Sequence, residues 1–142
     1  MTDRIALDSG PLGRLCHPHA NTAFEAWFEQ LLIDGATVFI PEISDYELRR
    51  ELIRAGLSRG IERLNGFKRR LHYLPITTAT MLRAAEMWAD ARSRGLPTAD
   101  PKELDADAIL AAQAERVKAI VATDNVGHLS RFIEARRWQD IV

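Results

Sequence analysis

Four acidic residues lie far apart in the sequence, each at a point where a strand is expected to end or a helix to begin; they are Asp8, Glu47, Asp107 and Asp124. The first and the last follow short apolar segments, and the other two lie in the opening turns of expected helices. In a parallel α/β sheet, these two kinds of position share one edge. The sequence therefore predicts that the four carboxylates meet there.

An acidic cluster of this kind needs a cation. Carboxylates within a few ångströms of one another repel, and some would take up protons unless a cation neutralised them. Mg²⁺ prefers oxygen ligands and keeps several waters, and Mn²⁺ accepts the same ligands. One or two such ions can activate water and stabilise the attacking and the leaving oxygen of a displacement at phosphorus. We therefore expect an open Mg²⁺ or Mn²⁺ site suited to hydrolysis of phosphodiester bonds.

Each acid also has a purely structural explanation. The segment 44–47 fits a capping box, in which Glu47 bonds back to the backbone amide of Ser44. Asp105 or Asp107 could simply cap a helix, and the acids that follow the two strands could be turn residues. These separate explanations do not account for four acids directed to one edge, so we favour the metal site.

The elements that would position these acids alternate between strand and helix. Strands are predicted at 4–7, 37–40, 74–76 and 119–122, with 138–142 as a last edge strand, and residues 9–11 form a turn. Helices are predicted over about 22–34, 44–55, 58–71, 78–95 and 105–115, the first capped by Asn21 and the fourth by Thr78, with a polar loop over 96–103. This alternation favours an α/β fold, a three-layer α/β/α sandwich around a mostly parallel sheet of four or five strands.

Size and composition are those of an ordinary globular protein. The 142 residues suit one domain spanning 1–142, and 46% hydrophobic with 27% charged residues excludes a disordered or fibrous chain. No apolar run approaches the ~20 residues of a membrane span, and no signal sequence is apparent, so we expect a cytoplasmic protein without a membrane partner. The single cysteine, Cys16, cannot form an internal disulfide.

Charge is distributed unevenly, although the net charge is only −1. Eight basic residues and two acidic ones lie between Arg49 and Arg70, and arginine outnumbers lysine sixteen to three over the chain. Guanidinium groups suit bidentate contacts with phosphate, which makes Arg49, Arg50 and Arg54 candidate substrate contacts. A solvated helix face, or a surface for an acidic partner protein, explains the same residues equally well.

Four short segments, spread over nearly the whole chain, carry a family resemblance. They are Ile5-Ala6-Leu7-Asp8-Ser9, the stretch 41–48 ending Tyr46-Glu47-Leu48, Asp107-Ala108-Ile109-Leu110-Ala111-Ala112, and Val121-Ala122-Thr123-Asp124-Asn125 with His128-Leu129 following. In this order they resemble the PIN-domain ribonuclease family, specifically the VapC-like toxins of type II toxin–antitoxin systems. The resemblance implies a metal-dependent endoribonuclease acting on RNA, a homodimer, and inhibition by an antitoxin whose C-terminal segment occupies the groove.

The resemblance also separates neighbouring candidates. The family's third acid is followed by two residues, an aliphatic residue and paired alanines, a frame that Asp107 fits and Asp105 does not. Asp105 is left with an outer-sphere role. Asp8 and Asp107 are therefore the expected metal ligands, completed by Glu47, with Ser9 as a secondary site residue.

The fourth motif departs from the family's commonest form, because the usual position of the last acid or asparagine holds Asn125. Asp124 stands one residue earlier. Three options stay open: Asp124 ligates directly, Asn125 holds a metal-bound water, or Thr123 contributes its hydroxyl.

Two other functions compete with the nuclease. A phosphoacceptor signalling domain also has an acidic Mg²⁺ pocket, but it needs adjacent acids after its first strand and a lysine after its last core strand, which this chain lacks. A solitary nuclease without an antitoxin, or a non-catalytic module that binds RNA or protein through the basic segment, remains the alternative.

Overall fold

The structure is a computed structural model that describes residues 3–19, 21–95 and 101–142, the last range without the side chains of 101–103. A sheet of five parallel strands lies at its centre, in the order β3-β2-β1-β4-β5. The strands are β1 (Arg4–Leu7), β2 (Thr37–Pro41), β3 (His72–Leu74), β4 (Ile120–Ala122) and β5 (Ala135–Arg136). The parallel α/β fold expected from the alternation is confirmed.

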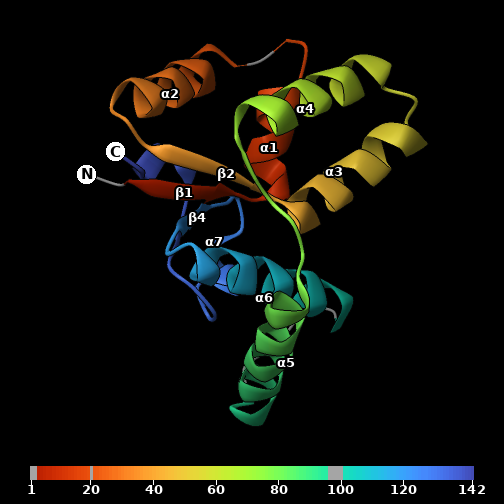
Figure 1. Ribbon diagram of the computed structural model, residues 1–142, viewed down its shortest axis with the longest axis vertical. Helices are drawn as coiled ribbons and strands as arrows, with labels where there is room; N and C mark the ends of the chain where they lie inside the picture. The colour runs from red at the N-terminus through yellow and green to blue at the C-terminus, as the bar shows by residue number, and fades with distance from the viewer. Residues whose placement is uncertain (1–2, 20, 96–100) are drawn as a thin grey trace.

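Helices cover both faces of this sheet (Figure 1). They are α1 (Ser9–Cys16), α2 (Thr22–Ile33), α3 (Glu42–Arg54), α4 (Ser58–Arg70), α5 (Thr78–Ser93), α6 (Pro101–Arg116) and α7 (Val126–Leu129), with the 3₁₀ turn η1 (Trp138–Asp140) near the end of the chain. Helices α1, α2 and α4 lie on one face, α6 and α7 on the other, and α5 packs outside α6. Helix α3 leaves the end of β2 and contacts helices of both layers.

Apolar side chains on both faces of β1 join the two layers. Ile5 and Leu7 point into the core formed with α1, α2 and α4, whereas Ala6 points into the core formed with α6. All three are fully buried. Burial on both faces is the reason that the central strands of a parallel sheet read as continuous apolar runs.

Local signals located most element boundaries. The Asn21 side chain accepts hydrogen bonds from the backbone N–H groups of Ala23 and Phe24, as an N-cap should, and Gly35 ends the α2 region at φ +85°. Helix α5 is capped by Thr77 and not by Thr78, since the Thr77 hydroxyl accepts from the amide of Thr80. These signals are accurate to within one residue.

Several predicted elements were wrong. Residues 9–11 belong to helix α1 and not to a turn, because Pro11 lies in the first helical turn, where its missing N–H is no loss. The third strand ends at Leu74, before Pro75, which has no N–H to donate to a ladder. The predicted edge strand 138–142 is absent, and β5 lies earlier, at Ala135–Arg136.

The end of the chain is held by aromatic packing in place of strand pairing. The Trp138 ring lies 5.2 Å from that of Phe24 and 5.6 Å from that of Trp27, and the Trp27 indole N–H donates to the carbonyl of Ile141. The polar loop predicted over 96–103 is wrong for 101–103, which begin α6; residues 96–100 lie outside the described residues. None of the described helices has both the length and the apolar character needed to cross a membrane.

Candidate active site

The carboxylate of Asp8 is held in a fixed orientation at the end of β1. Its Oδ1 accepts a hydrogen bond from the backbone N–H of Ser9 (2.7 Å), which makes Asp8 the N-cap of α1. Its Oδ2 accepts from the hydroxyl of Thr123 (2.7 Å), a fully buried residue that follows β4. Two adjacent strands thus fix one carboxylate.

Glu47 lies deeper in its helix than the sequence suggested. Helix α3 begins at Glu42, directly after Pro41, so Ser44 is already inside the helix and the capping box is wrong. The start of α3 is held instead by Gln113, whose side-chain oxygen accepts from the backbone N–H of Ile43 (3.2 Å). The Glu47 carboxylate is therefore not used as a cap.

Asp107, like Glu47, lies further into its helix than the sequence suggested. Helix α6 begins at Pro101 and not near Asp105, because proline suits a first helical position, and Asp107 therefore lies in the second turn. Glu47 and Asp107 therefore each lie one turn further from the start of their helix than predicted.

One cavity of about 280 Å³ at the carboxyl edge of the sheet brings these acids together. It is lined by Asp8, Ser9, Gly10, Glu47, Asp107, Asp124 and Asn125, which we term the acidic cavity. Thr123 lies behind it and contacts it through Asp8. Asp105 lines a neighbouring groove that shares Glu47 with the acidic cavity.

The electrostatics of the acidic cavity are those of crowded like charges. Burial, together with the nearby carboxylates of Asp8 and Asp107, raises the pKa of Glu47 to about 7, against a partial offset by Arg50. Burial also raises the pKa of Asp8; the charge of Asp124 adds to this, and the Thr123 hydrogen bond opposes it. Such a cluster favours a bound proton or a bound cation.

Asp124 and Asn125 both reach the acidic cavity. Asp124 forms an ion pair with Arg14 of α1 (3.0 Å), and it lies so close to Gly10 that a Cβ there would be 2.5 Å from Asp124 Oδ2. The backbone N–H of Asn125 donates to the Thr123 hydroxyl (2.9 Å). The Thr123 hydroxyl thus already contacts Asp8 and Asn125, whereas Asp124 and Asn125 line the acidic cavity; which of the three completes the site stays a prediction.

Sequence reasoning missed Arg14 and Gly10. Both lie in helix α1, which was taken for a turn, and the pairing of Arg14 with Asp124 spans 110 residues. A Ser-Gly-Pro sequence directly after an aspartate was the available signal, since aspartate caps helices and proline is tolerated in a first turn.

The candidate substrate arginines have different surroundings. The Arg49 guanidinium is bound by Asp45 (2.7 Å) and Asn65 (2.9 Å), which joins α3 to α4 and gives this side chain a structural role. Arg54 pairs with Glu51 on the exposed side of α3. Arg50 lines the groove beside the acidic cavity.

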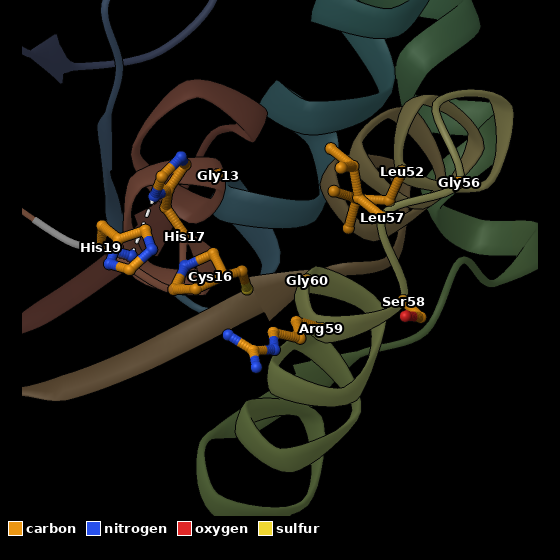
Figure 2. Close-up of a pocket in the computed structure, with 11 residues that line it drawn as sticks. Gly13, Cys16, His17, His19, Leu52, Gly56, Leu57, Ser58, Arg59 and Gly60 are labelled. Carbon is orange, nitrogen blue, oxygen red and sulfur yellow. Dashed lines mark hydrogen bonds between the residues drawn. The ribbon is translucent and has the colours of Figure 1, made fainter.

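A larger cavity of about 460 Å³ lies away from the acids, between the end of α1 and the turn that joins α3 to α4. Figure 2 shows Cys16, His17 and His19 on one side of it and Leu52 and Leu57 on the other. Burial raises the pKa of the Cys16 thiol to about 12, so this thiol is protonated near neutral pH.

The chemistry of the acidic cavity fits a hard divalent ion. Its side-chain donors are carboxylate and amide oxygens with one hydroxyl, the ligands that Mg²⁺ and Mn²⁺ prefer. Over the described ranges 3–19, 21–95 and 101–142, no three His, Cys, Asp or Glu side chains are arranged to hold a metal ion as they stand. The fit is therefore one of donor type and charge.

Comparison with known proteins gives a family match and several similar folds. A family model described as PIN domain matches residues 5–132. A structure of VapBC2 from Rickettsia felis, bound to a DNA fragment from its promoter, is 18% identical with a TM-score of 0.78, over 95% of this chain and 98% of that chain. FitAcB from Neisseria gonorrhoeae is 23% identical with a TM-score of 0.69, over 96% and 99%.

A third similar fold is that of DNA-bound VapBC from Salmonella typhimurium, 20% identical with a TM-score of 0.69, over 96% of this chain and 98% of that chain. No curated protein sequence matches this chain.

Proposed function

This chain belongs to the PIN domain family, and from that membership and the acidic cavity we propose that it is a divalent-metal-dependent endoribonuclease, the toxin of a toxin–antitoxin pair. The observation that carries the proposal is the meeting of Asp8, Glu47, Asp107 and Asp124 in one cavity, where burial and like charge raise the pKa of Glu47. A protein gains no stability from such crowding, so a function that uses it is the simplest explanation.

In the proposed mechanism, Asp8 and Asp107 would hold the ion, and Glu47 with Asp124 or Asn125 would complete its surroundings. When bound, Mg²⁺ or Mn²⁺ would neutralise these carboxylates and activate water for attack at phosphorus. Thr123 positions Asp8 by donating to Oδ2. Ser9 contributes its backbone N–H to Oδ1, which leaves the remaining lone pairs of the carboxylate for the cavity. RNA as the substrate rests on the family resemblance.

The test is hydrolysis of a labelled single-stranded RNA by purified protein with Mn²⁺ or Mg²⁺, and its abolition by EDTA. Asp8→Asn and Asp107→Asn should each lower kcat by about 100-fold or more, since each removes a charged ligand from the metal site. Asparagine can still cap α1, so Asp8→Asn should fold. Asp90→Asn, which changes an exposed carboxylate on α5, is the matched control. Full activity in both cavity variants would refute the metal site.

The resemblance implies an antitoxin whose C-terminal segment occupies the groove, and we propose that the antitoxin also contacts a second surface, away from the acidic cavity. The described linings of the acidic cavity and its neighbouring grooves include no residue of the basic helix α4, whereas the larger cavity of Figure 2 is lined by Ser58, Arg59 and Gly60 of that helix. Exposed Leu57 at its rim offers an apolar anchor. An antitoxin segment with apolar and acidic side chains fits this surface.

Two measurements test the toxin assignment. The product of a small gene adjacent to this one should bind the protein and inhibit RNA cleavage, and Arg59→Glu should weaken that binding while cleavage by the free protein persists. Light scattering should give the mass of a homodimer, the state that the resemblance implies. A monomer that binds no such product would favour a solitary nuclease.

A further inference from the structure

A second groove, of about 290 Å³, opens from the acidic cavity between α3 and α6. The two share Glu47, so a chain whose phosphate lies at the acids has an adjoining nucleotide at this groove. Its other lining residues include Ile43, Tyr46, Arg50, Asp105 and Ile109.

Tyr46 is the distinctive member of this lining. It is 57% exposed, unlike the aromatic residues Phe24 and Phe28, which are buried in the core. The Arg50 guanidinium lies over its ring, 5.1 Å from the ring centroid. A guanidinium over a tyrosine ring leaves the outer faces of this stacked pair for a further ring, and unstacked RNA bases pack on aromatic rings and guanidinium planes of this kind.

The charges of the groove select a base over a phosphate. Glu47 and Asp105 lie at its rim, and both would repel an anionic phosphate. Ile43 and Ile109 supply apolar surface, which favours a neutral planar ring. Arg50 is the one cation among the described lining residues, and its position over Tyr46 places it beside a stacked base.

We propose that this groove, between α3 and α6, is a nucleobase subsite in which the base of the nucleotide next to the scissile phosphate stacks on Tyr46 and Arg50. The inference rests on the proposed nuclease function for the position of the phosphate. A different groove, which shares Gly10 and Asp124 with the acidic cavity, is lined by Arg14, His17 and Asn21, polar side chains suited to backbone contacts.

The test is the fluorescence of 2-aminopurine, which is quenched when this base stacks. A series of oligouridine RNAs, each with 2-aminopurine at one position, is titrated with protein in EDTA, where hydrolysis does not occur. Wild-type protein should quench the probe at one preferred position. Tyr46→Ala should remove the quenching and weaken RNA affinity about tenfold, within the range for loss of a stacking residue. Tyr46→Phe, which keeps the ring, should restore it.

Ile53→Ala is the matched control, because Ile53 is 62% exposed on the same helix and lies outside the groove. With Mn²⁺ present, Tyr46→Ala should raise KM for RNA and leave kcat nearly unchanged. Quenching that survives in Tyr46→Ala, or wild-type protein that does not bind the RNA, overturns the base subsite. Quenching that depends on Tyr46, without cleavage by the wild type in Mn²⁺, supports the subsite and overturns the nuclease.

Discussion

Two carboxylates on helix α3, only two residues apart, have opposite surroundings. Asp45 is 3% exposed and lies against the guanidinium of Arg49, which in turn bonds to Asn65 of α4. Glu47 lines the acidic cavity, where burial and the carboxylates of Asp8 and Asp107 raise its pKa. One side of the helix pairs opposite charges, and the other gathers like charges.

The difference separates structural charge from functional charge. A buried carboxylate with a guanidinium partner can be explained by the joint that it makes between two helices, and it requires no ligand. A partly buried carboxylate beside two others, whose charge Arg50 offsets only in part, is better explained by what it binds. Asp45 and Glu47 therefore have different roles because they face different sides of α3. The predictions below test this difference between structural and functional charge.

The largest expected effect is on the structural side. Asp45→Asn removes the charge that balances Arg49 and should lower the free energy of unfolding by about 3 kcal/mol, the low end for breaking a buried pair because the Arg49 side chain is 28% exposed. Urea denaturation measures this. The exposed Glu51→Gln, which loses only a surface pair with Arg54, should change stability by less than about 1 kcal/mol. Equal effects in the two variants would contradict the division.

The next effect concerns the contact that holds the start of α3. Gln113 is buried; its side-chain oxygen accepts from the amide of Ile43 and its NH₂ group donates to the carbonyl of Leu74 (2.7 Å). Gln113→Leu keeps the approximate volume and leaves both backbone groups without this partner, which should cost about 2 kcal/mol. The variant should also lose cleavage activity at temperatures where it remains folded, because α3 carries Glu47. Unchanged activity in the folded variant would show that Gln113 does not position the acidic cavity.

A smaller effect is expected at the close approach of Gly10 to Asp124. In Gly10→Ala, the new Cβ would lie 2.5 Å from Asp124 Oδ2, so the carboxylate must turn away and its pair with Arg14 is lost. Both side chains are nearly half exposed, and the loss of stability should be about 0.5 kcal/mol. RNA cleavage should fall several-fold, which is more than so small a loss in the free energy of unfolding would cause. Gly66→Ala, where a Cβ meets nothing within 4 Å, is the control.

The parts of this fold that depend on local signals could be predicted from the sequence. The apolar segment 4–7 and the cap at Asn21 are local, and both are found as expected. Helix α1 could not be predicted, because a Ser-Gly-Pro sequence suits a turn equally well. The end of the chain could not be predicted either, because Trp138 is placed by packing against rings more than 100 residues away.

The acidic cavity could be anticipated for a different reason. The rule that strand ends and helix starts share one edge of a parallel sheet tolerates an error of one helical turn, so Glu47 and Asp107 reach the cavity from second turns. Details that depend on long-range contacts, such as the bond from Thr123 to Asp8 across 115 positions, left no local signal. The roles of these residues in metal binding and cleavage remain predictions.

The smallest expected effect has the opposite sign to the first. The folded-state pKa of Glu47 is about 7, above its ordinary value of 4.5, so the folded protein holds this proton more tightly than the unfolded chain. The stability that Glu47 contributes is therefore present below pH 4.5 and is lost as the pH rises to about 7. In EDTA, Glu47→Gln should be as stable as the wild type at pH 4.5 and more stable at pH 8. The difference in stability between the variant and the wild type is small, because water screens the charge of a partly exposed group.

The measurement is the difference in urea midpoint between wild type and Glu47→Gln across this pH range. Asp45→Asn at the same pH values supplies the contrast, since it should be less stable than the wild type at pH 8, where its partner Arg49 is charged. A gain for Glu47→Gln beside a loss for Asp45→Asn would establish that α3 separates two kinds of charge. A loss of stability in both at pH 8 would mean that Glu47 is also held by a favourable contact, and the acidic cavity would then need no ion to explain it.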